Sequence, residues 1–533
     1  MKTSSKILMI SLMLVGIEIY PQYPNFRIYP SSAVQIEPVI VRHPTNQQIL
    51  FASAYTISPP SFRSEGIYVS TDGGNSWRGN DTNTGSNLNF HGGDPGPVID
   101  KNGVFIITHL PPSATGMLSN FSTDQGLTWS VNNLIYNATF VDKAFTATDD
   151  APSSPFYGRS YVAFTRFSPP YPLVYSFTTN GGTNWSTVSQ LNSSCNGNRS
   201  YGPSISVGPT GVVFIAWASS ITISPYSEDY IGFAKSSNGG INWNVNECAI
   251  DCNGIRATQL PPWGIRSNSN PTLDVDKTGG PRNGWIYVAI ANKNLPPAGS
   301  DPDIVFHRST DNGNTWSSGV RVNQDQINNG RNQFFPIIRA DENGGINIIY
   351  YDSRHAADSV DVYLSRSTDG GTSWNDFRVT SNRFMPKSPV GSSGNMGDNL
   401  GLTSGNGFLY PAWMSDQVTE RQFQIWYAKI NYTTIGIKQI STEIPGSFAL
   451  MQNYPNPFNP VTHIQFEIPE EKSNVSLIVY DINGKEIETL VNQQMKPGTY
   501  EAAFDAAQLG SGVYFYILRT DSFFESKKMI LVK

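Results

Sequence analysis

An eight-residue segment recurs six times between residues 70 and 374, and it restricts the fold of this chain more than any other feature. The first copy reads STDGGNSW (70–77). The others are STDQGLTW (122–129), TTNGGTNW (178–185), SSNGGINW (236–243), STDNGNTW (309–316) and STDGGTSW (367–374). Self-similarity at a period of this order indicates a repeated structural unit, not six separate active sites.

Short segments rich in β-branched and aromatic residues precede each copy, as in GVVFIAWAS (211–219), GWIYVAIAN (284–292) and GINIIYYDS (345–353). Such segments, separated by Gly and Asn turns, are typical of strands. The order strand–turn–strand–loop–strand–turn–strand occurs in six modules, and a seventh module reaches its third strand. It predicts an all-β fold, a β-propeller in which four-stranded sheets are arranged radially.

The last module (408–430) has no copy of the motif and therefore lacks an obvious fourth strand. The segment NFRIYP (25–30) precedes the first module and can supply that strand, which would join both ends of the propeller in one blade. We therefore expect seven blades. Six is the alternative if the first and last modules merge.

The third position of the repeated motif is always an acid or its amide. It is occupied by Asp72, Asp124, Asn180, Asn238, Asp311 and Asp369. Such a side chain accepts hydrogen bonds from the backbone N–H groups of a turn, and the following Gly adopts a positive φ without strain. The Asn copies keep the acceptor but lose the charge, and the closing Glu of a calcium loop is missing. We expect a structural role and no metal.

The motif resembles the Asp box, or BNR repeat, of sialidases and related β-propellers. This resemblance implies a propeller over residues 23–436. Asp boxes occur in catalytic and non-catalytic propellers, so the resemblance implies no particular reaction. Sialidases bind the substrate carboxylate with an arginine triad whose first member lies in an R-I-P motif. Here FRIYP places Arg27 in a similar context, but Tyr29 interrupts the motif.

In a propeller, the residues that precede each first strand or follow each second strand lie on the face opposite the repeated loops. The carboxylates at these places are the expected catalytic residues: Asp94, Asp142, Asp352 and Asp398. The expected substrate-binding residues are Lys143, Arg199, Asn270, Arg331, Arg354, Trp217, Tyr351 and Trp413. Arginine grips a carboxylate bidentately, so the set suits an anionic glycan. The alternative is that these groups brace one another around a hydrated channel.

A different pattern begins after residue 436. Residues 437–447 form a predicted linker, and segments such as THIQFEI and GVYFYILR predict a small antiparallel β-sandwich at 448–533. The pieces NYPNPFNP, VYDINGKEI, GVYFY and KKMILVK resemble the C-terminal sorting domain of type IX secretion cargo in the Bacteroidota. This resemblance implies the type IX secretion machinery as a partner, and passage through the periplasm and across the outer membrane.

The N-terminus and the bulk composition agree with export. Lys2 and Lys6 accompany the apolar run ILMISLMLV (7–15), which predicts a signal peptide at 1–22 and no transmembrane segment in the mature chain. The net charge of −6 offers no basic surface for nucleic acid, and we expect no cofactor. Cys195, Cys248 and Cys252 allow one disulfide or three buried thiols.

Two functions fit these features. The first is a secreted or cell-surface glycoside hydrolase of sialidase-like type, an exo-glycosidase that acts on extracellular glycans or glycoproteins. The second is a non-catalytic propeller that binds glycan or protein at the cell surface.

Overall fold

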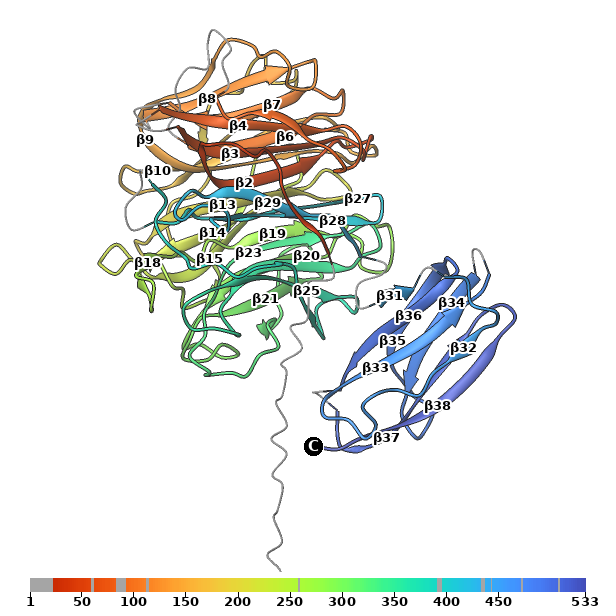
Figure 1. Cartoon of the computed structure of the whole chain (residues 1–533). Helices are drawn as coiled ribbons and strands as arrows, with labels where there is room; N and C mark the ends of the chain where they lie inside the picture. Colours follow the sequence, from red (N-terminus) through yellow and green to blue (C-terminus); the bar gives the residue numbers. More distant parts are fainter. Residues whose placement is uncertain are drawn as a thin grey trace, which may run out of the picture.

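The structure, a computed structural model, describes residues 23–58, 62–82, 93–111, 115–256, 259–390, 395–432, 437–441, 443–470, 473–506 and 509–533. These residues form strands and turns without a single helix, and the strands make up two bodies (Figure 1). No apolar helix long enough to cross a membrane therefore occurs in this part of the chain. The predicted signal peptide lies outside the described residues.

Antiparallel four-stranded sheets account for most of the larger body. One contains β2 (Val34–Arg42), β3 (Leu50–Ser58), β4 (Phe62–Ser70) and β5 (Arg78–Asn80). Others contain β13 (Arg199–Val207), β14 (Val213–Ser220), β15 (Glu228–Ser236) and β16 (Asn244–Asp251), then β19 (Thr272–Val275), β20 (Ile286–Asn292), β21 (Asp303–Ser309) and β22 (Val320–Arg321), then β23 (Gln333–Ala340), β24 (Ile346–Asp352), β25 (Asp361–Ser367) and β26 (Asn375–Arg378). A short hairpin of β17 (Gln259–Leu260) and β18 (Ile265–Arg266) lies between β16 and β19 in the chain.

A seven-stranded sheet interrupts this series. It contains β6 (Gly93–Ile99), β7 (Phe105–Leu110), β8 (Thr115–Ser122), β9 (Asn133–Thr148), β10 (Ser160–Arg166), β11 (Leu173–Thr178) and β12 (Ser189–Gln190). The 16-residue strand β9 serves two modules. Its first half pairs with β8 and its second half pairs with β10, so β9 is the fourth strand of one module and the first strand of the next.

The last sheet of this body joins the two ends of the predicted propeller. It contains β27 (Gly401–Gly405), β28 (Phe408–Ser415), β29 (Gln424–Ala428) and β1 (Asn25–Arg27), with β30 (Ile430–Asn431) also paired to β28. Strand β1 pairs antiparallel with β29, with Asn25 opposite Ala428 and Arg27 opposite Trp426. The N-terminal segment thus supplies the missing strand, as the sequence predicts.

The six repeated loops share one hydrogen-bond pattern. In every copy the Asp or Asn accepts a hydrogen bond from the hydroxyl two residues earlier and from the backbone N–H four residues later. The same hydroxyl accepts from the Gly N–H that follows. Asn180 and Asn238 keep both bonds, so the negative charge is dispensable for the turn.

The motif tryptophans connect neighbouring modules. Each tryptophan that follows a repeated loop contacts a residue of the preceding module: Trp129 with Phe51, Trp185 with Ser119, Trp243 with Tyr175, Trp316 with Phe233 and Trp374 with Phe306. Trp77 of the first sheet contacts Tyr427 in β29 of the last. The repeated motif therefore fastens module to module through buried aromatic area, including across the junction of the two ends.

One disulfide joins two neighbouring modules. Cys195, which follows β12, is bonded to Cys248 in β16, and the two Cα atoms are 5.6 Å apart. Cys252 is a buried free thiol. The structure thus selects one bridge and one thiol from the arrangements that the sequence leaves open.

The C-terminal body is a sandwich of two antiparallel sheets with its own hydrophobic core. One sheet contains β31 (Ile437–Ser441), β36 (Gly498–Asp505), β33 (Val461–Ile468) and β32 (Ala449–Leu450). The other contains β35 (Glu486–Met495), β34 (Ser473–Tyr480), β37 (Gly512–Arg519) and β38 (Phe524–Leu531). The predicted linker is wrong in its first half, because β31 pairs with β36 and so belongs to this sandwich.

We expect Asp369→Ala to lower the free energy of unfolding by about 1–2 kcal/mol, because it removes the acceptor for the N–H groups of Thr372 and Ser373. Asp369→Asn, which reproduces the natural Asn180 loop, serves as the matched control and should cost less. Chemical unfolding of the full chain measures both. Equal losses for the two variants would contradict the turn-fastening role.

Candidate functional site

A repeated backbone irregularity brings polar side chains together at the starts of the first strands. Pairing shifts by a bulge in β2, β6, β13 and β23, and β9 carries a similar shift opposite β10. A residue with positive φ lies at each irregularity: Glu37, Asp94, Lys143, Gly202 and Phe335. A bulge re-aims its side chain out of the ladder, so consecutive modules place their residues at equivalent positions.

Lys143 is the centre of this cluster and is only 4% exposed. Its ammonium nitrogen lies 2.7 Å from Asp398 Oδ2, 3.3 Å from Asp94 Oδ1 and 3.6 Å from Glu37 Oε1. Burial opposes the charge, but the three carboxyl groups outweigh it, so the pKa of Lys143 is well above its ordinary value. The lysine is therefore a permanent cation that holds acids from three other strands or loops.

Asp94 and Asp142 are two neighbouring carboxyl groups within the cluster. The backbone N–H of Lys143 donates to both, to Asp94 Oδ2 at 2.8 Å and to Asp142 Oδ1 at 3.0 Å. Burial and the charge of Asp94 raise the pKa of Asp142 well above its usual value. Burial alone would raise the pKa of Asp94, but the charge of Lys143 and the hydrogen bonds to Asp94 outweigh it, so the pKa is below its ordinary value. Neighbouring carboxyl groups with pKa values driven apart can act as proton donor and acceptor.

Tyr201 completes this arrangement from β13. Its hydroxyl donates to Asp142 Oδ2 at 3.4 Å, and the Arg256 guanidinium lies over its ring, 3.5 Å from the ring centre. Burial raises the pKa of Tyr201 above its ordinary value. Tyr201 thus keeps its proton at neutral pH unless Asp142 can accept it.

Arginines surround the same tyrosine. Arg256 Nη1 is buried and has no hydrogen-bond partner among the described residues. Arg199 stacks on Tyr226, 4.3 Å from the ring centre, and burial together with nearby Arg256 lowers its pKa. Two like charges held close together, one with a free donor, are suited to binding an anion.

Arg266 extends the cluster toward solvent. Its Nη2 atom lies 3.1 Å from Asp398 Oδ2, while 47% of its side chain is exposed. Asn268 Nδ2 donates to Asp398 Oδ1 at 3.0 Å. Burial alone would raise the pKa of Asp398, but the charges of Lys143 and Arg266 outweigh it and keep the pKa below its usual value. Asp398 is therefore a fixed anion between two cations.

Sequence reasoning missed Glu37, Tyr201, Arg256 and Arg266. A signal for Glu37 exists, because Glu37-Pro38 and Asp94-Pro95 are both an acid and a proline at the start of a first strand. Arg256 and Arg266 lie in the longest interval between motif copies, from 238 to 311, which contains the β17–β18 hairpin. Extra residues in one module of a repeat are where a binding face is expected.

Glu65 in β4 is a further buried acid beside the cluster. It is opposite Tyr55 in β3, and the Tyr55 ring lies against the backbone of Gly93, which precedes Asp94. Neither carboxyl oxygen has a hydrogen-bond partner among the described residues. Burial, then Asp94 and Glu37, raise the pKa of Glu65 well above its ordinary value, so it is a neutral acid.

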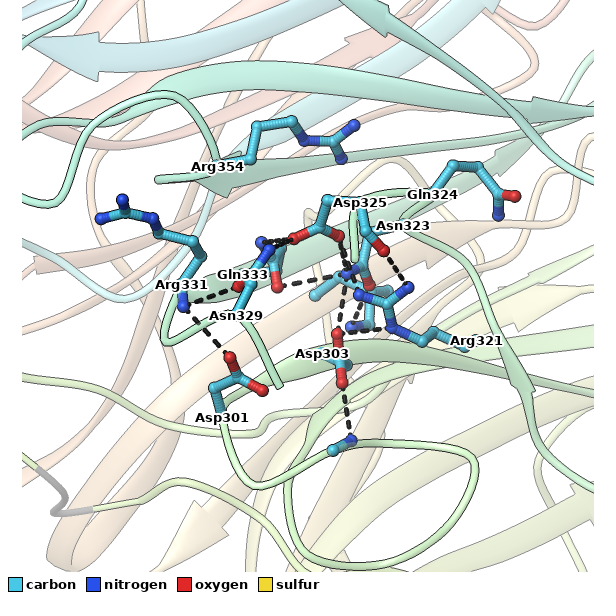
Figure 2. A network of polar contacts seen from close by, with 12 residues as sticks. Asp301, Asp303, Arg321, Asn323, Gln324, Asp325, Asn329, Arg331, Gln333 and Arg354 are labelled. Atoms are coloured by element: carbon cyan, nitrogen blue, oxygen red, sulfur yellow. Dashed lines mark hydrogen bonds and ion pairs between the residues drawn. The ribbon is translucent and has the colours of Figure 1, made fainter. Parts of the chain in front are cut away.

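The structure separates Asp352 and Arg354 from the Lys143 cluster. Arg354 pairs with Asp352 at 2.6 Å and with Asp376 at 2.7 Å. Gln333 links Asp352 to Asp325, and Figure 2 shows Asp325 in a network with Asp303 and Arg321 between neighbouring sheets. These two predicted site residues brace one another and their neighbours, which matches the alternative given for the polar residues of this face.

Two other predicted binding residues, Arg331 and Asn270, differ in their distance from the cluster. In Figure 2 the Arg331 guanidinium points away from the network, while its backbone N–H donates to Asp301 and Asn329. Asn270 lies against Gly202, beside Tyr201, and its Oδ1 is buried without a partner among the described residues. Asn270 is therefore close to the cluster.

The three predicted substrate-binding aromatics are core residues instead. Trp217, Tyr351 and Trp413 are fully buried. The Trp217 indole fills the space above Gly232, and the Tyr351 hydroxyl bonds to the backbone of Met414. Their apolar area stabilises the fold and is not available to a ligand, so this part of the prediction is wrong.

Arg27 is in the outermost strand of the last sheet, opposite Trp426. It is therefore at a sheet edge and not at the start of a first strand. A cavity of only about 10 Å³ adjoins Asp94 and Lys143, which is no larger than a water molecule. Among the described residues, no group of three or more His, Cys, Asp or Glu side chains could hold a metal ion.

Residues 452–533 match the family described as the secretion system C-terminal sorting domain. This domain indicates secretion to the cell surface or the extracellular space by the type IX route. No curated protein matches the sequence.

Solved structures with similarity to this chain include a protein of unknown function from Dyadobacter fermentans, at 11% identity and a TM-score of 0.41, covering 75% of this chain and 100% of that one. An ulvan lyase of a polysaccharide lyase family has 12% identity and a TM-score of 0.47, with 75% and 95% covered. An α-L-arabinanase from Penicillium chrysogenum has 15% identity and a TM-score of 0.40, with 64% and 97% covered.

The Glu37 carboxyl predicts a pH dependence of stability. Burial raises its pKa from 4.5 to about 7, with Lys143 opposing and Asp94 and Asp398 adding to the rise. Its contribution to stability is present below the unfolded-state pKa and is lost as pH rises through the folded-state value. The free energy of unfolding of Glu37→Gln, compared with that of wild type at the same pH, should therefore increase as the pH rises from about 4.5 to 7. Unfolding free energies of both proteins across this range test the sign, and a constant difference would contradict it.

The sorting domain predicts the fate of a truncated chain. Deletion of residues 448–533 removes the matched family segment, so the rest of the protein should accumulate in the periplasm instead of reaching the surface. Cell fractionation of a type IX-competent host measures this. The matched control carries an epitope tag with the domain intact, and surface display of the truncated chain would contradict the sorting role.

Proposed function

We propose that residues 23–436 form a seven-bladed β-propeller of Asp-box type, preceded by a signal peptide at 1–22, and that residues 448–533 direct its export. Three observations support this architecture. Seven four-stranded modules follow one another, with β9 shared by two. Neighbouring first strands contact one another from β2 through β27 and from β27 back to β2. The motif tryptophans link the modules in the same cyclic order.

We propose further that the propeller is an exported glycoside hydrolase that acts on anionic glycans outside the cell. One observation carries this proposal: the Tyr201 hydroxyl is bonded to the Asp142 carboxyl, and the Arg256 guanidinium lies over the Tyr201 ring. A phenol next to a carboxyl group can act as a nucleophile activated by a base, and guanidinium groups above it can hold the acidic group of a sugar.

The carboxyl pair provides a route for the phenol proton. Asp142 is protonated at rest, so it accepts the Tyr201 proton only as its own proton passes to the ionised Asp94. Lys143 stabilises Asp94 as an anion before transfer and loses that interaction as Asp94 becomes neutral. The phenolate oxygen then forms a bond to the anomeric carbon as the bond to the leaving oxygen breaks, and that oxygen takes a proton from solvent. Water next attacks the anomeric carbon of the tyrosyl intermediate, its proton returns to the Tyr201 oxygen, and Asp94 releases its proton to solvent.

Arg256, Arg199 and Arg266 are the proposed substrate-binding groups. Among the described residues Arg256 Nη1 has no hydrogen-bond partner, and Arg266 reaches from the buried Asp398 into solvent. Arg27 in its outer strand takes no part in this site, so the proposed enzyme differs from sialidases in its first arginine. Asp352 and Arg354 have a bracing role in this proposal.

The second candidate function is a non-catalytic propeller that binds the same class of glycan. The small size of the cavity at Asp94 and Lys143 favours it, because a reacting sugar needs more room than a water molecule occupies. Both candidates share the arginine site and differ in whether the Tyr201–Asp142 pair reacts.

Tyr201→Phe tests the choice between the two, because it removes the reacting hydroxyl and keeps the ring under Arg256. We expect it to reduce turnover by at least about 10³-fold, by loss of the nucleophile, while leaving glycan binding measurable. The assay follows release of reducing sugar by the full chain from sialyllactose, pectate and hyaluronan fragments.

Arg331→Ala is the control, since Arg331 lies outside the Lys143 cluster. Turnover retained in Tyr201→Phe would contradict the hydrolase mechanism. Binding without turnover by wild type would establish the non-catalytic alternative. Unsaturated sugar products would instead indicate that Tyr201 acts by proton abstraction.

A further inference from the structure

A groove of about 400 Å³ opens beside the β17–β18 hairpin. It combines apolar and polar side chains, and its lining includes Pro262, Trp263, Asp358, Met385, Pro386 and Lys387. This size is in the range of small-molecule binding sites. The groove comes from three parts of the chain: the hairpin, the segment between β24 and β25, and the segment that follows β26.

Trp263 is a rigid surface within this groove. Its indole N–H donates to the backbone oxygen of Asp358 at 2.9 Å, and its ring lies 6.0 Å from that of Phe334. Asn332 Nδ2 anchors the hairpin by donating to the backbone oxygen of Pro261 at 2.9 Å. Since the indole N–H is already bonded, the ring offers a ligand only its apolar face, at little cost in side-chain entropy.

The groove and the arginine site border the same short strand, β18. Ile265 lines the groove, and the next residue, Arg266, binds Asp398 of the Lys143 cluster. Successive side chains of a strand point to opposite sides, so β18 presents Ile265 to the groove and Arg266 to the Lys143 cluster. Each place also holds one cation: Lys387 in the groove, paired with Glu420 at 2.8 Å, and Arg266 toward the cluster, paired with Asp398.

We infer that this groove is a second sugar-binding subsite, in which the Trp263 ring stacks on a sugar unit of an anionic glycan chain whose reacting unit is at Tyr201. This inference rests on the proposed function and deepens it. The substrate is a chain of several sugars, not one terminal sugar. A flat aromatic face bordered by Asp358, Ser388 and Lys387 suits the mixed apolar and hydroxylated surface of a pyranose ring.

Binding of pectate and hyaluronan oligosaccharides of increasing length tests the subsite, measured by calorimetry with the full chain carrying Tyr201→Phe to prevent cleavage. Affinity should rise with length as the chain reaches the groove. Trp263→Ala should reduce this gain about three- to tenfold, the value of one aromatic contact, and Trp263→Phe should recover part of it. Trp285→Ala is the matched control, because Trp285 is half-buried beside the repeated loop at Gly370.

The outcomes separate the subsite from the function on which it rests. Length-dependent binding that is insensitive to Trp263→Ala would overturn the subsite and leave the proposed function standing. Absence of binding and turnover with every glycan would overturn both. Trp263-dependent binding of proline-rich peptides, with glycan binding unchanged in Trp263→Ala, would overturn the subsite in favour of a protein ligand.

Discussion

The buried ammonium group of Lys143 joins parts of the chain that are far apart in sequence. Its partners are Glu37 in β2, Asp94 in β6 and Asp398 just before β27, so one cation connects the first strands of both ends of the larger body. Taking such charges out of water is costly, and removing one partner of a buried pair typically costs about 3–5 kcal/mol. The cluster therefore constrains how the modules meet, and the pKa values of Asp94, Asp142 and Glu37 depend on it.

The two faces of the larger body differ in how far their residues repeat from module to module. On the face of the repeated loops, six copies of one hydrogen-bond pattern fix the turns, with Asp or Asn as the acceptor, and six tryptophans join neighbouring modules. On the other face the residues at equivalent bulges are all different: Glu37, Asp94, Lys143, Gly202 and Phe335. The residues that repeat in every module stabilise the fold. The candidate site is formed by residues that differ between modules and by the β17–β18 hairpin, which occurs in one module.

Local chemistry made several parts predictable. Asp369 and its counterparts act within four residues of themselves, so a sequence window contains the whole turn. The order of strands, the role of residues 25–27 and the candidates Asp94, Asp142, Lys143 and Asp398 follow from counting strands in each module. The prediction that Trp217, Tyr351 and Trp413 bind substrate is wrong for a related reason. Adjacent residues of a strand point to opposite faces, and a residue near a strand end can be fully buried when the next sheet covers it.

The amino-acid sequence alone was enough to establish the repeating strand modules, the turn chemistry of the six loops and the C-terminal sorting domain, because each depends on contacts between residues close in the chain. Tertiary structure decided which distant residues meet. Asp94 is near the start of the first strand β6 and Asp352 ends the second strand β24, so both are expected on one face, yet Asp352 pairs with Arg354 while Asp94 faces Lys143. It also decided the pairing of Tyr201 with Asp142 and Arg256, and the groove at Trp263. Burial and Coulomb interactions act through space, so their outcome depends on the packing of whole sheets.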